Sequence, residues 1–115
     1  GAYYGVTPIT SGTAVVLSSS AVPVAYDLMQ NYPNPFNPST SIGFSVPEAG
    51  HVTLSIYDMT GRLVSTLVNG TFSEGVHVVD WNGLDSSGEM VSAGVYIYAL
   101  ESSDMVMTKK MIFLK

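Results

Sequence analysis

The sequence contains no cysteine, which excludes a disulfide framework and a thiolate metal site. Basic residues are also scarce, because four lysines and arginines stand against nine aspartates and glutamates, for a net charge of −5. Affinity for nucleic acid depends on lysine and arginine side chains that neutralise phosphates. The charge balance therefore argues against a nucleic-acid partner.

Long apolar runs are missing as well, although the chain is unusually apolar. Hydrophobic residues make up 46% of the sequence and charged residues only 11%. No uninterrupted apolar run approaches the roughly 18–20 residues that a membrane-spanning helix needs. We therefore expect a chain that does not span a membrane and that carries apolar surface able to pair with other protein.

Helical periodicity is nearly absent, whereas alternating apolar residues and turn signals recur at a spacing of about 8–12 residues. This pattern is typical of an all-β antiparallel sandwich or barrel, and the length of 115 residues suits one domain. The segment Asn69-Gly70 is a strong hairpin signal, because both residues tolerate positive φ. Six strands are predicted after residue 39: 40–46, 51–58, 63–68, 76–81, 95–100 and 105–114.

Alternation within these strands predicts which side chains form the core. The strand over residues 95–100 is apolar on both faces, so we expect something beyond a two-sheet sandwich to cover its second face. Trp81 is interpreted as a lid over the core rather than as a ligand-stacking residue. The residues expected to be largely buried are Val52, Leu54, Ile56, Val78, Trp81, Val95 and Ile97.

The segment between Asn31 and Thr40 holds three prolines in six residues. Each proline fixes its own φ and pushes the preceding residue towards extended geometry. We predict a stiff, extended strap across one end of the sandwich, with Tyr32 and Phe36 packed onto the core.

Residues 1–26 carry no charge and alternate β-rich pieces with Gly, Ser and Thr spacers. This composition is unlike that of a disordered tail. We divide the chain into an apolar N-terminal arm, residues 1–27, and a sandwich, residues 28–115. The arm could complete its own sandwich or pair as a donated strand with another copy of the chain. Its candidate docking residues are Val15, Leu17, Val22, Val24 and Tyr26.

Residue patterns for catalysis are missing. His51 and His77 stand alone on strands, and no serine lies in a nucleophile elbow or beside a plausible base. We predict no enzyme activity and no required cofactor. A weak calcium candidate remains in a glycine-rich loop, since calcium prefers hard oxygen ligands, but Asp85-Ser-Ser-Gly88 also reads as a type I turn. The residues of this weak metal candidate are Asp80, Asn82, Asp85 and Glu89.

Four features occur together in one order: the Asn-Pro-rich segment, the 52–61 strand and turn, Gly94-Val-Tyr-Ile-Tyr98, and a Lys-Lys-apolar terminus. This order resembles the C-terminal sorting domain of the type IX secretion system, the Por secretion tail. It also resembles the immunoglobulin-like domain of the flagellar hook-capping protein. The resemblance covers about residues 28–115, and it implies an immunoglobulin-like sandwich of about seven strands. The residues that match the sorting family's end motif are Lys109, Lys110, Met111, Phe113, Leu114 and Lys115.

The resemblance implies an exported protein, located outside the cell or at its surface, and leaves two functions open. In the first, the sandwich is a structural subunit that self-assembles into a fibre, each chain donating its apolar arm to the next. In the second, it is a sorting tail that directs a cargo protein to the type IX secretion machinery. A calcium- or carbohydrate-binding accessory domain is a more distant alternative.

Overall fold

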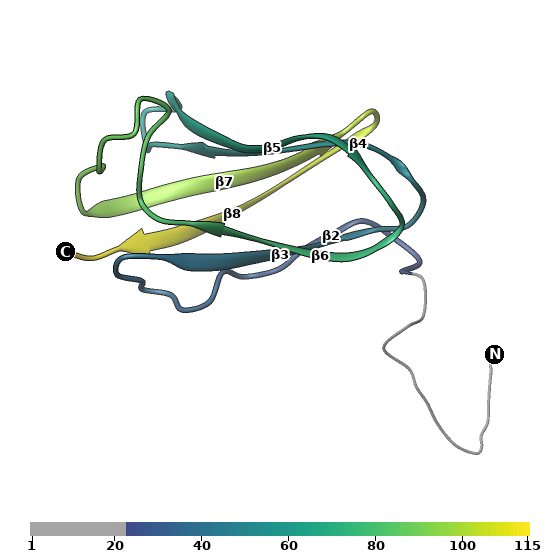
Figure 1. The fold of residues 1–115 in the computed structure, drawn as a ribbon, viewed down its shortest axis with the longest axis horizontal. Helices are drawn as coiled ribbons and strands as arrows, with labels where there is room; N and C mark the ends of the chain where they lie inside the picture. The colour runs from purple at the N-terminus through teal and green to yellow at the C-terminus, as the bar shows by residue number, and fades with distance from the viewer. Residues whose placement is uncertain (1–22) are drawn as a thin grey trace, which may run out of the picture.

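The computed structural model describes residues 23–115, which form two antiparallel β-sheets packed as two layers (Figure 1). One sheet has the strand order β2-β3-β6 and the other the order β5-β4-β7-β8. Within the described residues there is no helix, and so none that could cross a membrane. The strands are β2 (Asp27–Leu28), β3 (Thr40–Val46), β4 (Gly50–Tyr57), β5 (Leu63–Phe72), β6 (Gly75–Trp81), β7 (Gly94–Ser102) and β8 (Met105–Phe113).

This architecture confirms the predicted all-β, immunoglobulin-like sandwich of about seven strands. The six strands expected after residue 39 are all present, and β3 has the predicted bounds. The prediction of a hairpin turn at Asn69-Gly70 is wrong, because both residues lie inside β5 and pair with Thr53 and Val52. The physical reason is that the chain crosses to the other sheet after β5. A tight two-residue hairpin would instead have kept the next strand in the same sheet.

The core lies between the sheets and follows the alternation of the strands. Val52, Leu54 and Ile56 of β4 are fully buried, and Trp81 at the end of β6 is 2% exposed, as predicted. The three β4 residues face the inward side chains of β3 in the opposite layer, whereas Trp81 lies in the same sheet as β3. The further buried hydrophobic residues of the core are Leu28, Phe36, Ile42, Phe44, Val46, Val64, Tyr96, Tyr98, Leu100, Met111 and Phe113.

Three residues of β6 and β7 that were predicted to be buried do not face the core. Val78 is 63% exposed and Val95 is 37% exposed, while Ile97 is only half-buried. In β7 the larger side chains Tyr96 and Tyr98 occupy the inner face. These large aromatic groups remove more apolar area from water than the aliphatic residues on the other face would.

In β6 the inward face carries His77, Val79 and Trp81. The His77 ring lies 5.5 Å from that of Phe44 and 5.0 Å from that of Phe72. The sequence pattern predicts that both histidines are exposed on strand faces. This prediction is wrong for His77, which is half-buried among aromatic rings, and is confirmed for His51, which is exposed. The Nε2 atom of His77 lies 2.8 Å from the Ser73 carbonyl oxygen, which satisfies one ring nitrogen. A histidine placed in this way supports packing rather than proton transfer.

The second face of β7 remains partly open to solvent. Val95 pairs with Ile112 of β8 on that face, and the two side chains are 37% and 40% exposed. In the part of the chain that the structure describes, only two layers are present, so no third layer covers this face (Figure 1).

Candidate functional site: the proline loop and the C-terminal strand

The proline-rich segment forms a loop that leaves β2 and returns to β3; we call residues 31–40 the proline loop. Its two ends are joined, because Tyr32 N donates to Ser41 O over 3.0 Å and Ser41 N donates to Tyr32 O over 2.9 Å. The prediction of an extended strap is therefore wrong: the segment is a closed loop beside the C-terminus of the chain (Figure 1).

Buried polar groups fix the base of this loop. Asn31 and Thr40 are each 2% exposed, and the Asn31 Nδ2 donates to Thr40 Oγ1 over 3.0 Å. Both side chains also donate to the carbonyl of Pro33, over 3.1 Å from Asn31 and 2.8 Å from Thr40. Buried polar groups are costly unless they are paired, so this set of hydrogen bonds holds the loop in one arrangement.

Tyr98 of β7 joins the other sheet to the same place. Its hydroxyl donates to the carbonyl of Met29 over 2.7 Å and accepts from the Asn31 N–H over 2.9 Å. Burial raises the pKa of the Tyr98 hydroxyl, and the Asn31 hydrogen bond partly opposes that rise. The tyrosine therefore links the two layers through a neutral hydroxyl that both donates and accepts a hydrogen bond.

Phe36 attaches the tip of the loop to the last residues of β8. Its N–H donates to Ile112 O over 3.0 Å, and its carbonyl accepts from Leu114 N over 2.9 Å. Asn34 adds a third hydrogen bond, because its Oδ1 accepts from Ile112 N over 3.0 Å. The loop thus forms a short parallel bridge that covers the end of the β8 edge.

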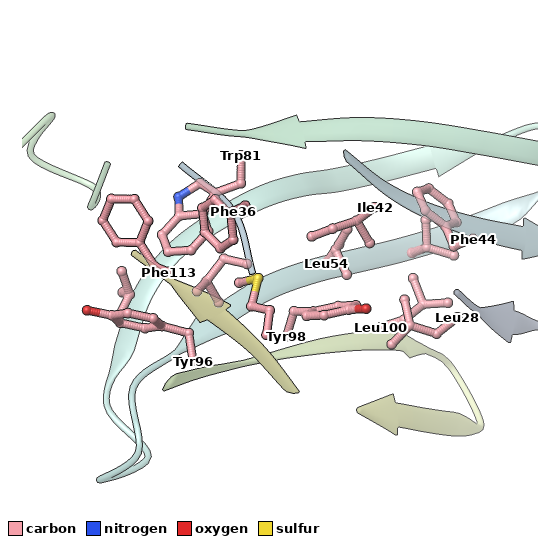
Figure 2. Close-up of a cluster of buried hydrophobic side chains, with 14 of the residues drawn as sticks. Leu28, Phe36, Ile42, Phe44, Leu54, Trp81, Tyr96, Tyr98, Leu100 and Phe113 are labelled. Carbon is pink, nitrogen blue, oxygen red and sulfur yellow. The ribbon is translucent and has the colours of Figure 1, made fainter. Parts of the chain in front are cut away.

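The Phe36 side chain also closes one end of the core. Its ring is stacked on Phe113 with centroids 5.0 Å apart and lies 5.6 Å from Trp81 (Figure 2). Phe36 is 1% exposed, which confirms its predicted packing, whereas Tyr32 is 81% exposed and its predicted packing is wrong.

Trp81 is a core lid, as interpreted from the sequence. Its Nε1 donates to the carbonyl of Leu84 over 2.9 Å, which satisfies the buried indole N–H. Gly83 adopts φ +77°, and a Cβ there would lie 3.1 Å from the Phe113 ring. The Trp-x-Gly pattern therefore lets the chain pass closely over the aromatic end of the core.

The sorting-type end motif is divided between the core and the surface. Met111 and Phe113 are buried, with exposures of 0% and 1%. Lys109 is half-buried, and the remaining residues of the motif are exposed: Lys110, Leu114 and Lys115. A partner that binds the folded chain can therefore reach only the outward half of this motif.

Two turns with the same hydrogen-bond pattern lie together at one cleft. In the turn over residues 58–62, Asp58 Oδ1 accepts from the N–H groups of Thr60 and Arg62 over 2.9 and 3.0 Å. In the turn over residues 85–89, Asp85 Oδ1 accepts from the N–H groups of Ser87 and Glu89 over 3.0 and 3.0 Å. The sequence predicts the turn at Asp85-Ser-Ser-Gly88, and the same Asp-x-(Thr or Ser)-Gly spacing in residues 58–61 indicates that the two turns are alike.

Hydrogen bonding lowers the pKa of both aspartates, chiefly through the hydroxyls of Thr60 for Asp58 and Ser87 for Asp85. Between the turns lies an open cleft of about 550 Å³, which Arg62 and Tyr96 also line. Both carboxylates are committed to their turns, so neither is poised as a general base.

The weak calcium candidates do not converge. Asp80 Oδ1 accepts from Ser41 Oγ over 2.7 Å, and Asp85 is occupied by its own turn, while Asn82 and Glu89 are exposed. Within residues 23–115 no three His, Cys, Asp or Glu side chains gather as metal ligands would. Gly88, with φ +87°, donates its N–H to Asp85 O over 3.0 Å. This hydrogen bond closes the turn over residues 85–88 that the sequence offered as the alternative to a calcium site.

Part of the predicted arm lies within the described residues. Tyr26 is half-buried and packs against the core, whereas Val24 is 100% exposed. Val15, Leu17 and Val22 lie outside the described residues, so their predicted docking role stays a prediction.

The sequence matches a known domain family over most of the sandwich. Residues 34–105 match the FlgD Ig-like domain. The basal-body rod modification protein FlgD of Salmonella typhimurium is 39% identical over 56 residues, which cover 49% of this chain. That stretch is 24% of the Salmonella protein, so the match spans about a quarter of that relative.

Solved structures share the fold. FlgD of Pseudomonas aeruginosa has a TM-score of 0.52 at 25% identity, over 64% of this chain and 57% of that one. Dimeric latent PorU of Porphyromonas gingivalis has a TM-score of 0.64 at 23% identity, over 87% of this chain and 10% of that one. PorZ of the same organism, a surface component of the type IX secretion system, has a TM-score of 0.51 at 24% identity, over 84% and 12%.

Proposed function

The chain belongs to the FlgD Ig-like domain family, and from that premise we propose that it is a non-enzymatic structural module of an extracellular assembly. FlgD and PorZ, which share its fold, are named as flagellar and secretion-system components. The observation that carries the proposal is the exposed Val24 at the end of an uncharged segment. An exposed apolar residue beside an uncharged, β-rich segment favours contact with another protein surface.

The polar groups of residues 23–115 support a structural role. Asp58, Asp85 and Tyr98 serve turns or the join between sheets, and His77 packs against aromatic rings. A catalytic site would need a base and a reacting group that remain free and near each other in a pocket.

We propose further that residues 1–26 join one copy of the chain to the next by strand donation. A donated strand gains backbone hydrogen bonds along a sheet edge and covers apolar area at roughly 25 cal/mol per Å². Because donor and acceptor are different surfaces, the contact is head-to-tail and generates an open filament unless the rotation closes a ring.

Charge placed in the arm tests this function. The double change Val15→Lys and Leu17→Lys should abolish assembly, because a lysine on a paired apolar position must be desolvated. The matched control, Ser18→Lys with Ser20→Lys, adds the same charge at polar positions and should assemble. Electron microscopy of both variants gives the readout, and filaments from the Val15/Leu17 variant would contradict strand donation.

A second function is favoured by the outward half of the end motif. Lys110, Leu114 and Lys115 are exposed beside the proline loop, which would present them to secretion machinery at a fixed position. The test is secretion of a reporter fused ahead of this chain in a bacterium with a type IX system. Lys110→Glu should block export and Thr108→Glu, on the same face of β8, should not. Equal export of the Lys110→Glu and Thr108→Glu fusions would contradict the sorting function.

A further inference from the structure

The sandwich has three long strands at its sheet edges, and they differ in how they are protected. Strand β6 borders one sheet, while β5 and β8 border the other. An unpaired edge can template another strand, and natural proteins block this with charged side chains, proline, bulges or covering segments. The edge strand with the fewest of these features is the one most open to a partner strand.

Strands β8 and β5 both carry such protection. β8 contains Lys109 and Lys110, and the proline loop covers its end through Phe36. The pairing of β5 with β4 shifts register twice, once beside Ser55 and once beside Tyr57, which marks bulges in the edge. A straight partner strand would pair with either edge over only part of its length.

Strand β6 has little of this protection. It pairs with β3 through seven consecutive residue pairs without a register shift, and it contains no proline. Its only acidic or basic side chain besides His77 is Asp80, close to its end. Val76 and Val78 project from its outer face and are 58% and 63% exposed. β6 is thus a regular edge with two adjacent apolar positions on one face.

We infer that β6 is the edge that accepts the arm of a second copy, a conclusion that rests on the proposed strand donation. The arm residues that fit are 13–17, Thr-Ala-Val-Val-Leu, which are uncharged and rich in β-branched side chains. Val15 and Leu17 are two residues apart, the same spacing as Val76 and Val78, so both pairs can share one face of the extended sheet.

We assign the donor to a second copy because β2, which follows the arm in the chain, does not lie beside β6. Leu28 pairs with Phe44 and Asp27 with Ser45, so β2 occupies the opposite side of β3 from β6. Going back along the chain, Tyr26 still packs against the core, whereas Val24 is 100% exposed.

Disulfide trapping in the full-length chain tests this edge, since the sequence has no cysteine of its own. The donor variant is Val15→Cys and the acceptor variant is Val78→Cys. Val106→Cys on the β8 edge is the matched control, because Val106 and Val78 have exposures of 64% and 63%. Pairing raises the effective concentration of the two thiols, so the Val15→Cys and Val78→Cys mixture should cross-link about tenfold faster than the control mixture or more.

The outcomes of the trapping experiment distinguish strand donation between copies from the choice of β6 as the accepting edge. Faster cross-linking to the Val106→Cys protein would overturn β6 as the acceptor and leave strand donation standing. Equal, slow cross-linking in both mixtures, with a monomeric wild-type chain, would overturn both. A Val15→Cys/Val78→Cys double variant that closes within one chain would keep the edge but overturn donation between copies.

Discussion

At the scale of single residues, the Tyr98 hydroxyl is the contact that joins the two sheets most directly. Tyr98→Phe should lower the free energy of unfolding by about 1–3 kcal/mol, because the buried Asn31 N–H and the Met29 carbonyl lose their partner. Denaturant unfolding measures this change. The control Tyr32→Phe alters a side chain that is 81% exposed and should stay within about 0.5 kcal/mol of wild type. Equal stability of both variants would contradict the role assigned to Tyr98.

Asp58 and Asp85 should make the stability depend on pH at acid pH. Hydrogen bonds in the folded chain hold both pKa values below the ordinary value of 3.8. The folded state therefore binds fewer protons than the unfolded state, so this stabilisation is complete above pH 3.8 and is lost as the pH falls through the lower folded-state pKa.

The double variant Asp58→Asn and Asp85→Asn should show a flatter loss of stability below pH 3.8 than the wild type. Thermal unfolding over an acid pH series measures this slope. Glu48→Gln, at an exposed position, serves as the charge control and should keep the wild-type slope. An unchanged slope in the double variant would show that the two turns do not carry this pH dependence.

At the scale of elements, the attachment of the proline loop to β8 depends on Phe36. Phe36→Ala should cost about 3–5 kcal/mol, because it empties the aromatic end of the core beside Trp81 and Phe113. It should also speed hydrogen exchange at the Ile112 and Leu114 amides, which the loop holds. Asn34→Ala removes one exposed hydrogen bond and should cost only about 0.5–1.5 kcal/mol. Slow exchange at both amides in Phe36→Ala would contradict the attachment.

The strand positions could be predicted from the sequence, but two of the inward faces could not. In β4, apolar Val52, Leu54 and Ile56 alternate with polar residues, so the face was unambiguous. In β7 both faces are apolar, and alternation alone cannot say that Tyr96 and Tyr98 point inward. In β6, His77 reads as polar although aromatic rings surround it, which reversed the predicted face.

The candidate site could be predicted only in part, for a related reason. Burial of Phe36 followed from an aromatic residue in a proline-rich segment, but its partner strand did not. The hydrogen bond between Asn34 and Ile112 joins residues 78 positions apart, and no local pattern encodes such a contact. The buried and exposed halves of the Lys-Lys-apolar terminus likewise depend on which face of β8 meets the core.

At the scale of the whole molecule, a two-sheet sandwich with a regular edge at β6 follows an uncharged N-terminal segment. The core, the proline loop and the turns are built from residues 23–115, and the division into arm and sandwich stays a prediction. Deleting residues 1–20 should therefore leave a folded chain that no longer assembles. Circular dichroism with sedimentation checks both properties, and loss of the fold would contradict the division into arm and sandwich.

Sedimentation velocity of the full-length chain over a concentration series measures whether copies of the chain assemble. Head-to-tail strand donation predicts species that grow well beyond the 12.2 kDa monomer as the concentration rises, because each added copy presents a new free edge. A single monomeric species at every concentration would contradict self-assembly.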